Sequence, residues 1–339
     1  MQSIIFSSNE ITTGDMPKPN IQEGQVLVKI KKTAISAGTE LYTIRHLQAG
    51  NKILLGYIAV GVVEATKDST SNLKIGDRVF VMCPHAEYGI KDSSMVIPIP
   101  DSMDFTEAAG VYWAVPAFRG VQKLKLNLYE DAAVIGAGPI GVMGLQLLRH
   151  TARKVAALDI NGKRLALAGE LGADICLNPV KQNIIQEMGK VIPEGVHGVL
   201  ESTGTAEGLR CALEIVRPGG TIVALRLPEN MGNLDLESYM YRKDLKLISS
   251  GCPGMSPSKE YLFNDKVHFT GYNSAIYPES WYFRKQIVAC FEMAAQKYIK
   301  IKPVISHEIN YKDAPDIYNQ LLDNNKSKEF LGVIINWEK

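Results

Sequence analysis

The chain has 339 residues, of which 46% are hydrophobic and 22% charged, and its net charge is +1. This composition is typical of a globular protein with room for two domains, and the near-zero charge gives no electrostatic reason to expect nucleic acid or an anionic membrane as a partner. No apolar run reaches the roughly 20 residues that span a bilayer, and the N-terminus lacks a signal-peptide pattern. The five cysteines form no CxxC pair, which argues against a disulfide framework and a structural zinc loop. We therefore expect a cytoplasmic protein.

The first 120 residues predict a β-rich domain. Short strand-like runs are separated by turn residues: VLVKIK, AVGVVEA, RVFVM and MVIPIP. Residues 54–65, LLGYIAVGVVEA, predict a buried strand that contains two glycines and Tyr57. Glycine inside a strand indicates a bulge or a close backbone approach. The phenol beside Gly56 needs a separate explanation.

From about residue 131, buried apolar runs alternate with helical patterns. In order these are AAVIGA, PIGVMGLQLLRH, KVAALDI, GKRLALAGELGA, GVHGVLEST, AEGLRCALEIV and GGTIVALR. Such alternation predicts a parallel sheet covered by helices on both faces. We place this α/β domain at residues 121–250, and we expect residues 1–120 and 251–339 to form the other domain.

The end of the chain is more varied. The aromatic-rich residues 261–283 are typical both of a cap over a substrate site and of an oligomer contact. An amphipathic helix is predicted at about 280–298. The strand VISHEI, a short helix near 313–323 and a closing strand FLGVIINW follow.

A glycine pattern follows the first strand of the α/β domain. Gly136-x-Gly138-x-x-Gly141 comes directly after an apolar strand and opens a helix. In that context it is typical of a dinucleotide site: the glycines permit a tight turn, a close approach of the pyrophosphate and close helix packing, and the helix N-terminus binds the phosphates. The alternative is a tight turn that binds no ligand. We assign five residues of this turn to cofactor binding: Gly136, Gly138, Pro139, Ile140 and Gly141.

The second strand of this domain ends in Asp159, eighteen residues after Gly141. A carboxylate there binds ribose hydroxyls and repels a 2′-phosphate, so we expect NAD in preference to NADP. Arg164 and its neighbour Lys163 weaken this preference, because they could reach a phosphate. The alternative role for Asp159 is a helix N-cap.

The chain resembles the medium-chain dehydrogenase/reductase superfamily along nearly its whole length. The matching stretches are EGQVLVKIKKTAISAGTE, LLGYIAVGVVEA, LKIGDRVF, HAEYGI, VIPIPDSMDFTEAAG, the glycine pattern, LAGELGAD, ESTG, VRPGGTIVAL and KPVISHEI. The resemblance implies a GroES-like β-rich catalytic domain and a Rossmann doubly wound parallel-sheet domain, with the active site between them.

The same resemblance implies further cofactor contacts. Thr203 and Gly204, in ESTG, match the loop that approaches the nicotinamide ribose. Leu225 and Arg226 end the next strand, and we include them in the cofactor site. Arg226 could contact the nicotinamide side or an anionic substrate; its alternative is a solvated loop charge.

In the zinc alcohol dehydrogenases of this superfamily, three ligands bind the catalytic zinc. The matching positions here are Ala37, Tyr57 and the stretch 110–116, which has no carboxylate or thiol. Alanine cannot bind a metal, and tyrosine is not a usual zinc ligand. The four-cysteine structural loop is also missing. We therefore expect no zinc. The motif SAGTE at residues 36–40, followed by Gly56-Tyr57 and by Pro84-His85, resembles the metal-free branch that includes bacteriochlorophyllide a dehydrogenase.

Without zinc, hydrogen-bond donors must manage the charge on the reacting oxygen. We expect Tyr57 and Thr39 to be the first candidates and His85 the next. Tyr57 could instead fill vacated space, and His85 could be a surface or capping histidine. Four residues are assigned to substrate binding: Ser36, Glu40, Tyr112 and Trp113. Glu40 could also orient its loop or be an exposed charge, and the two aromatics could be ordinary core.

These expectations describe an oxidoreductase that transfers hydride between a nicotinamide cofactor and a secondary alcohol or ketone of small or medium size. The alternatives are reduction of an activated C=C bond, as in metal-free enone or quinone reductases, and a non-catalytic nucleotide-sensing protein. We expect a small-molecule substrate and a homodimer, without nucleic acid or membrane partners. The fold does not name the substrate, because loop chemistry sets it.

Overall fold

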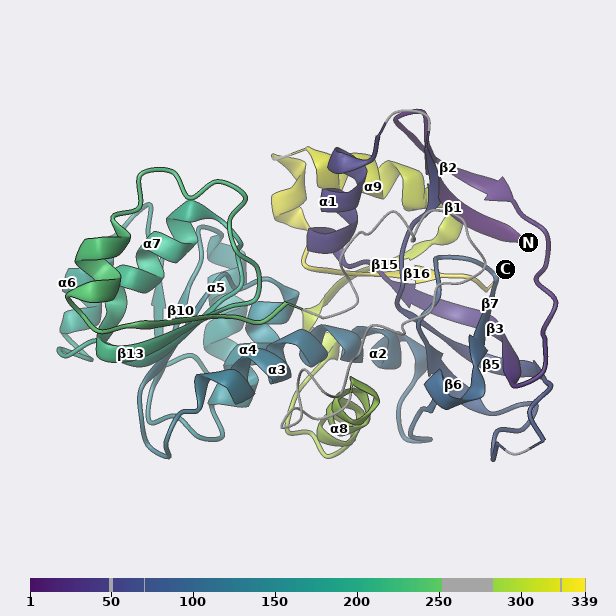
Figure 1. Cartoon of the computed structure of the whole chain (residues 1–339), viewed down its shortest axis with the longest axis horizontal. Coiled ribbons are helices and arrows are strands. Elements are labelled where there is room, and N and C mark those ends of the chain that lie inside the picture. Colours follow the sequence, from purple (N-terminus) through teal and green to yellow (C-terminus); the bar gives the residue numbers. More distant parts are fainter. Residues whose placement is uncertain (49–50, 70, 252–282, 324, 339) are drawn as a thin grey trace. The chain divides into compact units, whose positions relative to one another are not determined.

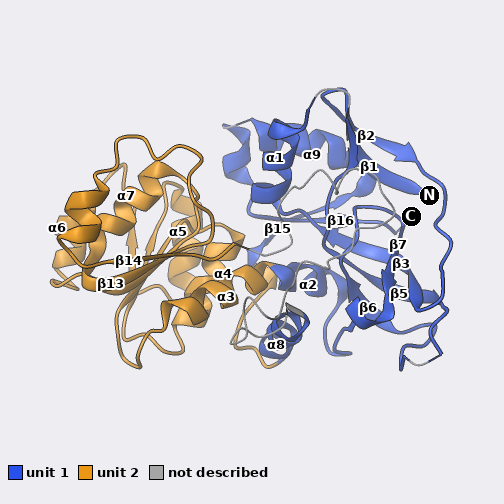
Figure 2. Cartoon of the chain, in the orientation of Figure 1, with its two compact units in different colours: residues 1–112, 253–295, 304–339 blue, residues 113–252, 296–303 orange. Residues whose placement is uncertain are grey.

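The computed structural model describes residues 1–48, 51–69, 71–251, 283–323 and 325–338 (Figure 1). They divide into two compact units (Figure 2): the described residues within 1–112, 253–295 and 304–339 form the first, and those within 113–252 and 296–303 form the second. The domain boundaries expected at residues 120 and 250 stay predictions. The aromatic segment 261–283 lies, up to residue 282, outside the described residues, so both interpretations of it stay predictions too.

The first unit is β-rich. Its strands are β1 (Gln2–Ser7), β2 (Glu10–Asp15), β3 (Gln25–Ala34), β4 (Lys52–Leu54), β5 (Ala59–Thr66), β6 (Arg78–Val81), β7 (Tyr88–Asp92), β8 (Ile97–Pro98), β15 (Ile305–Asn310) and β16 (Gly332–Asn336). Its helices are α1 (Ala37–His46), α2 (Phe105–Gly110), α8 (Phe283–Ala295) and α9 (Ala314–Leu322). One sheet has the order β2-β1-β4, and the other has the order β15-β16-β3-β5-β6-β8, with β7 also paired to β3.

The run at residues 54–65 is not one strand. It is divided between β4 and β5, because Gly56 has a φ of +85°, which no regular strand residue adopts. The expected close approach occurs at Gly61, where a Cβ atom would lie 2.2 Å from the carbonyl oxygen of Lys29. The pairing of β3 with β5 shifts register next to this point, between Ile30 and Lys32. The sequence therefore predicted the backbone distortion correctly and the strand length wrongly.

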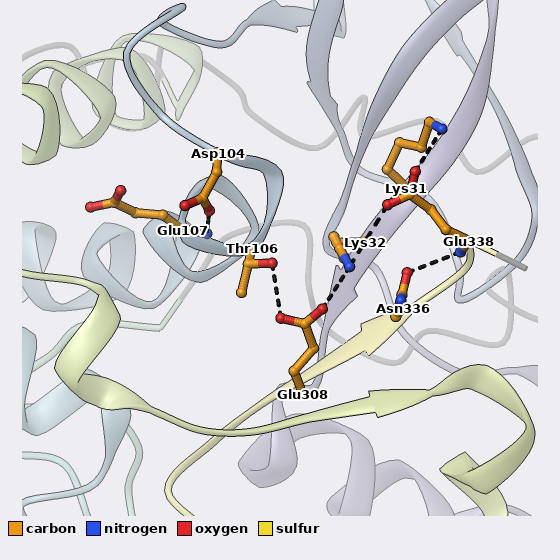
Figure 3. Close-up of polar contacts among 8 residues, drawn as sticks. All are labelled: Lys31, Lys32, Asp104, Thr106, Glu107, Glu308, Asn336 and Glu338. Atoms are coloured by element: carbon orange, nitrogen blue, oxygen red, sulfur yellow. Dashed lines mark hydrogen bonds and ion pairs between the residues drawn. The ribbon is translucent and has the colours of Figure 1, made fainter.

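A polar network joins the C-terminal strands to this unit (Figure 3). Glu308 of β15 accepts from Lys32 Nζ of β3 at 2.6 Å and from the Thr106 hydroxyl of α2 at 3.0 Å. Beside it, Lys31 Nζ donates to Glu338 at 2.8 Å. Because Lys32 is buried, its contact with Glu308 replaces the water that the ammonium group would otherwise need.

The second unit is a parallel sheet with helices packed against it. Its strands are β9 (Ala132–Ile135), β10 (Val155–Leu158), β11 (Ile175–Leu177), β12 (Val196–Glu201), β13 (Val216–Ala224) and β14 (Lys246–Ser249). Its helices are α3 (Ala114–Leu124), α4 (Pro139–Leu148), α5 (Gly162–Glu170), α6 (Ile184–Gly189) and α7 (Ala206–Ile215).

The strand order is β11-β10-β9-β12-β13-β14, and every neighbouring pair is parallel. The chain starts in the middle at β9 and winds outward in both directions. Crossovers between parallel strands of one sheet are almost always right-handed, and with this strand order they put helices on both faces, as the alternating sequence predicts. The order reverses beside β9, and ligands of such sheets bind at the carboxyl ends of the strands at that point. The glycine pattern lies there.

Candidate active site

The residues that follow β9, numbers 136–141, form what we call the glycine turn. Gly136 has a φ of +87°, and a Cβ atom on Gly141 would lie 1.8 Å from the carbonyl oxygen of Gly136, so both positions require glycine. Gly138 is different, because nothing lies within 4 Å of a Cβ placed there. It is the N-cap residue of α4, and no side chain caps that helix. The turn therefore leaves open space and amides at a helix N-terminus, which fits a pyrophosphate.

Asp159 is buried at the end of β10 and holds this turn. Its Oδ2 accepts from the Ala137 amide at 2.7 Å and its Oδ1 from the Asn161 amide at 2.7 Å. Asp159 is not the N-cap of α5; the cap is Asn161, whose side chain accepts from the amides of Lys163 and Arg164. The alternative role considered for Asp159 is thus wrong, because a second capping residue stands two positions later.

Glu201, at the end of β12, holds the loop that contains Thr203 and Gly204. Its carboxylate accepts from the Thr203 amide at 2.7 Å, from the Thr203 hydroxyl and from the Gly204 amide at 3.2 Å. Burial raises the pKa of Glu201, and these donors only partly oppose that effect. The Ser202 hydroxyl donates to the carbonyl groups of Ile135 and Gly136, which ties this loop to the glycine turn.

The end of β13 adjoins the same loop. The Leu225 amide donates to the carbonyl oxygen of Glu201 at 2.8 Å, and the side chain of Arg226 lies over Gly204. The Arg226 guanidinium is partly exposed and pairs with Glu229 at 2.9 Å. Its assignment to the cofactor stays a prediction.

A second set of polar side chains lies in the first unit; we call it the Glu40 cluster. Its members come from α1, from the loops before β5 and β7, and from α9: Ser36, Glu40, Tyr57, His85 and Tyr318. The carboxylate of Glu40 is at its centre. Oε1 accepts from the Ser36 amide at 2.7 Å, and Oε2 contacts His85 Nε2 at 3.2 Å and accepts from the Tyr318 hydroxyl.

Glu40 is only 3% exposed. Burial alone would raise its pKa, but the His85 ring, the Tyr318 hydroxyl and the Ser36 amide together lower the pKa below the ordinary value. Burial and the neighbouring carboxylate raise the pKa of Tyr318 well above its usual range, so Tyr318 stays a donor. Glu40 is therefore neither an exposed charge nor a strand-end residue; its contacts orient the turn before α1. The expected substrate contact stays a prediction.

Tyr57 and Ser36 form a pair of hydroxyl groups. The Tyr57 hydroxyl donates to Ser36 Oγ at 2.6 Å, and both side chains are partly exposed. Ser36 stands at the N-cap position of α1, but its side chain does not cap the helix. The Tyr57 ring also meets the Tyr112 ring edge-on, with centroids 5.6 Å apart. Tyr57 thus has the hydroxyl partner that a tyrosine requires when it is partly buried.

His85 is 0% exposed, so the interpretation of a surface or capping histidine is wrong. Its ring lies against Gly56, where a Cβ atom would approach the ring atoms to 2.4 Å. Nε2 faces Glu40, and Nδ1 is buried without a hydrogen-bond partner among the described residues. This arrangement makes His85 a support for Glu40 in this structure.

The remaining predicted residues lie nearby or in the core. Thr39 is partly exposed on the first turn of α1, and its carbonyl group accepts from the Thr43 hydroxyl at 3.0 Å. Tyr112 is 4% exposed and stacks on Phe80 with centroids 6.0 Å apart; Trp113 is equally buried. For these two aromatics the observed packing is that of core residues.

The sequence motifs do not single out Tyr318 of the first unit, nor Glu201 and Ser202 of the second unit. Glu201 had a detectable signal, because it directly follows the apolar strand GVHGVL. Tyr318 had none, since it shares the buried face of α9 with Ala314 and Leu321, in the spacing of ordinary core positions.

Two known protein families match this chain. The family described as "Alcohol dehydrogenase GroES-like domain" matches residues 22–118, and the family described as "Zinc-binding dehydrogenase" matches residues 139–263. The chain belongs to the medium-chain dehydrogenase family. Its fold is accordingly a GroES-like β-rich domain with a Rossmann-type domain, as expected, and this medium-chain dehydrogenase is an NAD(P)-dependent oxidoreductase of the alcohol-dehydrogenase type.

Similar proteins span the whole chain. The L-threonine 3-dehydrogenase of Coxiella burnetii (strain Dugway 5J108-111) is 26% identical over 360 residues, which cover 95% of both chains. The alcohol dehydrogenase of Geobacillus stearothermophilus is 26% identical over 69% of this chain and 78% of its own. The structure of the alcohol dehydrogenase TADH from Thermus sp. ATN1 superposes with a TM-score of 0.79, at 22% identity and 99% coverage of each chain.

Within the described ranges, no three His, Cys, Asp or Glu side chains converge as a metal site would need. Within the same ranges, every helix is too short or too polar to span a membrane.

Proposed function

We propose that this dehydrogenase transfers hydride between NAD(H) and a secondary alcohol or its ketone without a catalytic zinc, as in the metal-free branch of its family. One observation carries the proposal: the position of a zinc-binding histidine holds Tyr57, whose hydroxyl group is bonded to Ser36 at 2.6 Å. A site that handles a reacting oxygen with hydroxyl groups has less need of a Lewis acid.

The residues at the zinc positions do not fit the metal. Ala37 has no donor atom, and Tyr57 already donates to Ser36. The nearest carboxylate and imidazole, Glu40 and His85, face each other and are both buried. A catalytic zinc site needs three protein ligands and one open position. The reaction proposed here therefore does not use zinc.

The hydroxyl pair has a definite chemical capacity. Two hydroxyl groups in contact use one hydrogen between them and leave one to donate outward. Because the Tyr57 hydroxyl already donates to Ser36 Oγ, the outward hydrogen is that of Ser36. We propose that Ser36 gives this proton to the oxygen of a ketone substrate and takes the Tyr57 proton in its place, after which the partly exposed Tyr57 is reprotonated from solvent; alcohol oxidation runs the same transfers in reverse. Thr39, on the same turn, is the rival donor. Proton transfer of this kind typically contributes about a hundredfold to ten-thousandfold in rate.

The cofactor half fits a dinucleotide. The glycine turn and the N-terminus of α4 would hold the pyrophosphate, Asp159 the adenosine ribose, and the loop at Thr203 the nicotinamide side. When bound, the nicotinamide accepts or gives the hydride. Asp159 favours NAD over NADP, because its carboxylate would face a 2′-phosphate.

Tests of substrate class use purified protein and a panel of ketones, enones and quinones, with NADH oxidation followed at 340 nm. Turnover of ketones and the reverse reaction with their alcohols support the proposal. Turnover of enones or quinones alone would assign C=C reduction instead, and tight NADH binding with no turnover would indicate a nucleotide sensor.

The role of Tyr57 is tested with Tyr57→Phe, which keeps the ring and removes the hydroxyl. We expect kcat to fall about a hundredfold to a thousandfold with little change in NADH affinity. Thr39→Val is the matched change at the rival donor. Full activity of Tyr57→Phe, together with loss of activity in Thr39→Val, would transfer the role to Thr39.

Zinc and cofactor choice are tested separately. We expect no stoichiometric zinc by elemental analysis and no loss of activity with chelators; one zinc per chain that activity requires would refute the proposal. NADH should bind more tightly than NADPH. Repulsion between the Asp159 carboxylate and a 2′-phosphate should make the two affinities differ by about tenfold to a hundredfold. Asp159→Ser removes this repulsion and should bring the two affinities closer together.

A further inference from the structure

The Glu40 cluster contains one residue that no sequence pattern singled out, Tyr318 of α9. Its side chain is 0% exposed, and its hydroxyl donates to Glu40 Oε2, although the two residues are 278 positions apart. The ring belongs to the apolar core of the first unit, where a phenylalanine could pack in its place. A buried hydroxyl costs free energy unless it has a partner. The hydroxyl, rather than the ring, therefore needs an explanation.

An unbroken set of contacts leads from this hydroxyl to Tyr57. Tyr318 holds Oε2 of Glu40, while Oε1 accepts the Ser36 amide at 2.7 Å. The side chain of the same serine accepts from the Tyr57 hydroxyl at 2.6 Å. Ser36 does not cap α1 with its own side chain, and the Glu40 carboxylate is the side-chain group that binds the Ser36 amide before the helix.

The donors on Oε2 decide how rigid that carboxylate is. A carboxylate bonded through one oxygen can rotate about its terminal bond, whereas donors on both oxygens fix its plane. His85 and Tyr318 both contact Oε2, from different parts of the chain. Removal of the Tyr318 hydroxyl would leave Oε2 with the His85 contact alone, at 3.2 Å.

We propose that Tyr318 is a positioning residue for the reaction: it fixes the Glu40 carboxylate and, through it, the Ser36 hydroxyl that pairs with Tyr57. The effect on turnover rests on the proposed function, but the hydrogen-bond arrangement can be tested without a substrate.

The kinetic test compares Tyr318→Phe with Tyr311→Phe. Tyr311 is the matched control, because it is a buried tyrosine of the same C-terminal region, stacked on Trp337 and outside the Glu40 cluster. We expect Tyr318→Phe to lower kcat about tenfold, the effect of one hydrogen bond to a charged group, with the KM for NADH within about twofold. Tyr311→Phe should leave both constants within about twofold. Equal kcat in the two variants would overturn the proposal.

A double-variant cycle separates positioning from a general loss of stability. If Tyr318 acts through Tyr57, adding Tyr318→Phe to Tyr57→Phe should lower kcat no further. Independent, multiplying effects would overturn the proposal. If Tyr318→Phe fails to fold, Glu40→Asp withdraws the same carboxylate from the other side, and it should give the same tenfold loss and the same absence of additivity; a parent-like kcat would then count against the proposal.

Failure of every alcohol and ketone to turn over would refute the proposed function alone. Crystal structures of Tyr318→Phe and Tyr311→Phe would then still test the positioning role of Tyr318. We expect the contact between Tyr57 and Ser36 to open beyond 3.5 Å in Tyr318→Phe and to persist in Tyr311→Phe. An intact contact in both variants would show that Tyr318 does not position the pair.

Discussion

Each unit of the protein contains a buried glutamate that accepts three hydrogen bonds, and the two pKa values move in opposite directions. Glu40 in the first unit has a lowered pKa, while Glu201 in the second unit has a raised pKa. Burial acts against the charged form in both cases. Three donors are therefore not sufficient by themselves to keep a buried carboxylate ionised.

The difference lies in the kind of donor. Glu201 meets only neutral groups, namely the amides of Thr203 and Gly204 and the Thr203 hydroxyl. Glu40 meets the imidazole ring of His85 as well, and the attraction between them is the largest effect that opposes burial. A partner that can carry charge decides the direction. The Ser36 turn is thus held by a firmly ionised group, whereas the Thr203 loop is held by one that accepts a proton more readily.

The largest expected effect comes from breaking the Glu40 cluster at its centre. Glu40→Gln keeps the shape but places an amide against His85 and Tyr318, and removing one member of a buried charged pair typically costs about 3–5 kcal/mol. We expect a loss of this size in the free energy of unfolding at pH 7, measured by urea denaturation. Glu10→Gln is the control, because Glu10 is an exposed residue of the same unit. It should change the free energy of unfolding by less than about 0.5 kcal/mol. Equal stabilities would mean that the cluster is not ionised.

A smaller effect is expected when only the imidazole partner of Glu40 is removed. His85→Phe leaves Glu40 with the neutral donors Ser36 and Tyr318, so the pKa of Glu40 should rise, as that of Glu201 does. We expect about 2 kcal/mol lower stability at pH 7, the cost of a poorly satisfied buried group. The deficit should shrink on acidification, because Glu40 then becomes protonated in the variant. A deficit that is constant with pH would contradict this cause.

The pH dependence of stability should separate the two carboxylates. The lowered pKa of Glu40 contributes stability above the ordinary value of 4.5, and this contribution is lost as the pH falls through the folded-state pKa. The raised pKa of Glu201 acts the other way: its contribution is present below 4.5 and is lost as the pH rises through the folded-state pKa.

Urea denaturation from pH 3 to pH 8 checks this assignment in the two Gln variants. Glu40→Gln should reduce the slope below pH 4.5, and Glu201→Gln should reduce the slope above it. A tenfold change in a proton-binding constant corresponds to about 1.4 kcal/mol. The opposite assignment of slopes would invert the comparison.

The smallest effect is expected at Glu201 itself. Glu201→Gln retains one acceptor oxygen for Thr203 but turns a donor toward the Gly204 amide, so we expect a loss of about 1 kcal/mol in stability. NADH affinity should fall about threefold to tenfold at pH 8, because the loop is held less firmly. Fluorescence titration measures the NADH affinity. Glu207→Gln is the control, because Glu207 is exposed and lies in the first turn of α7. Unchanged affinity would separate Glu201 from the cofactor.

The backbone of the glycine turn was predictable because its information is local. The glycine turn, the strand before it and Asp159 lie in one short stretch, and close backbone contacts demand the glycines. The exception was the N-cap, since Asp159 and Asn161 are both good capping residues and only the structure shows which one caps α5.

The Glu40 cluster was not predictable in the same way. The sequence marks Tyr57 by its position beside Gly56, and it offers His85 and Glu40 only as separate candidates. Nothing local joins them to Tyr318, which comes from the far end of the chain and has the spacing of a core residue. Long-range side-chain contacts of this kind require the fold.

The position of β16 has a consequence for how the protein is made. β16 pairs with β3, and α9 supplies Tyr318 to Glu40, so these late elements complete structures begun by elements synthesised much earlier. Most of the second unit is one continuous stretch, and it can fold while synthesis is still under way. Residues 32–34 of β3 lack their partner strand until β16 has been synthesised. That interval, rather than the finished protein, is when the nascent chain is most exposed to aggregation and most dependent on chaperones.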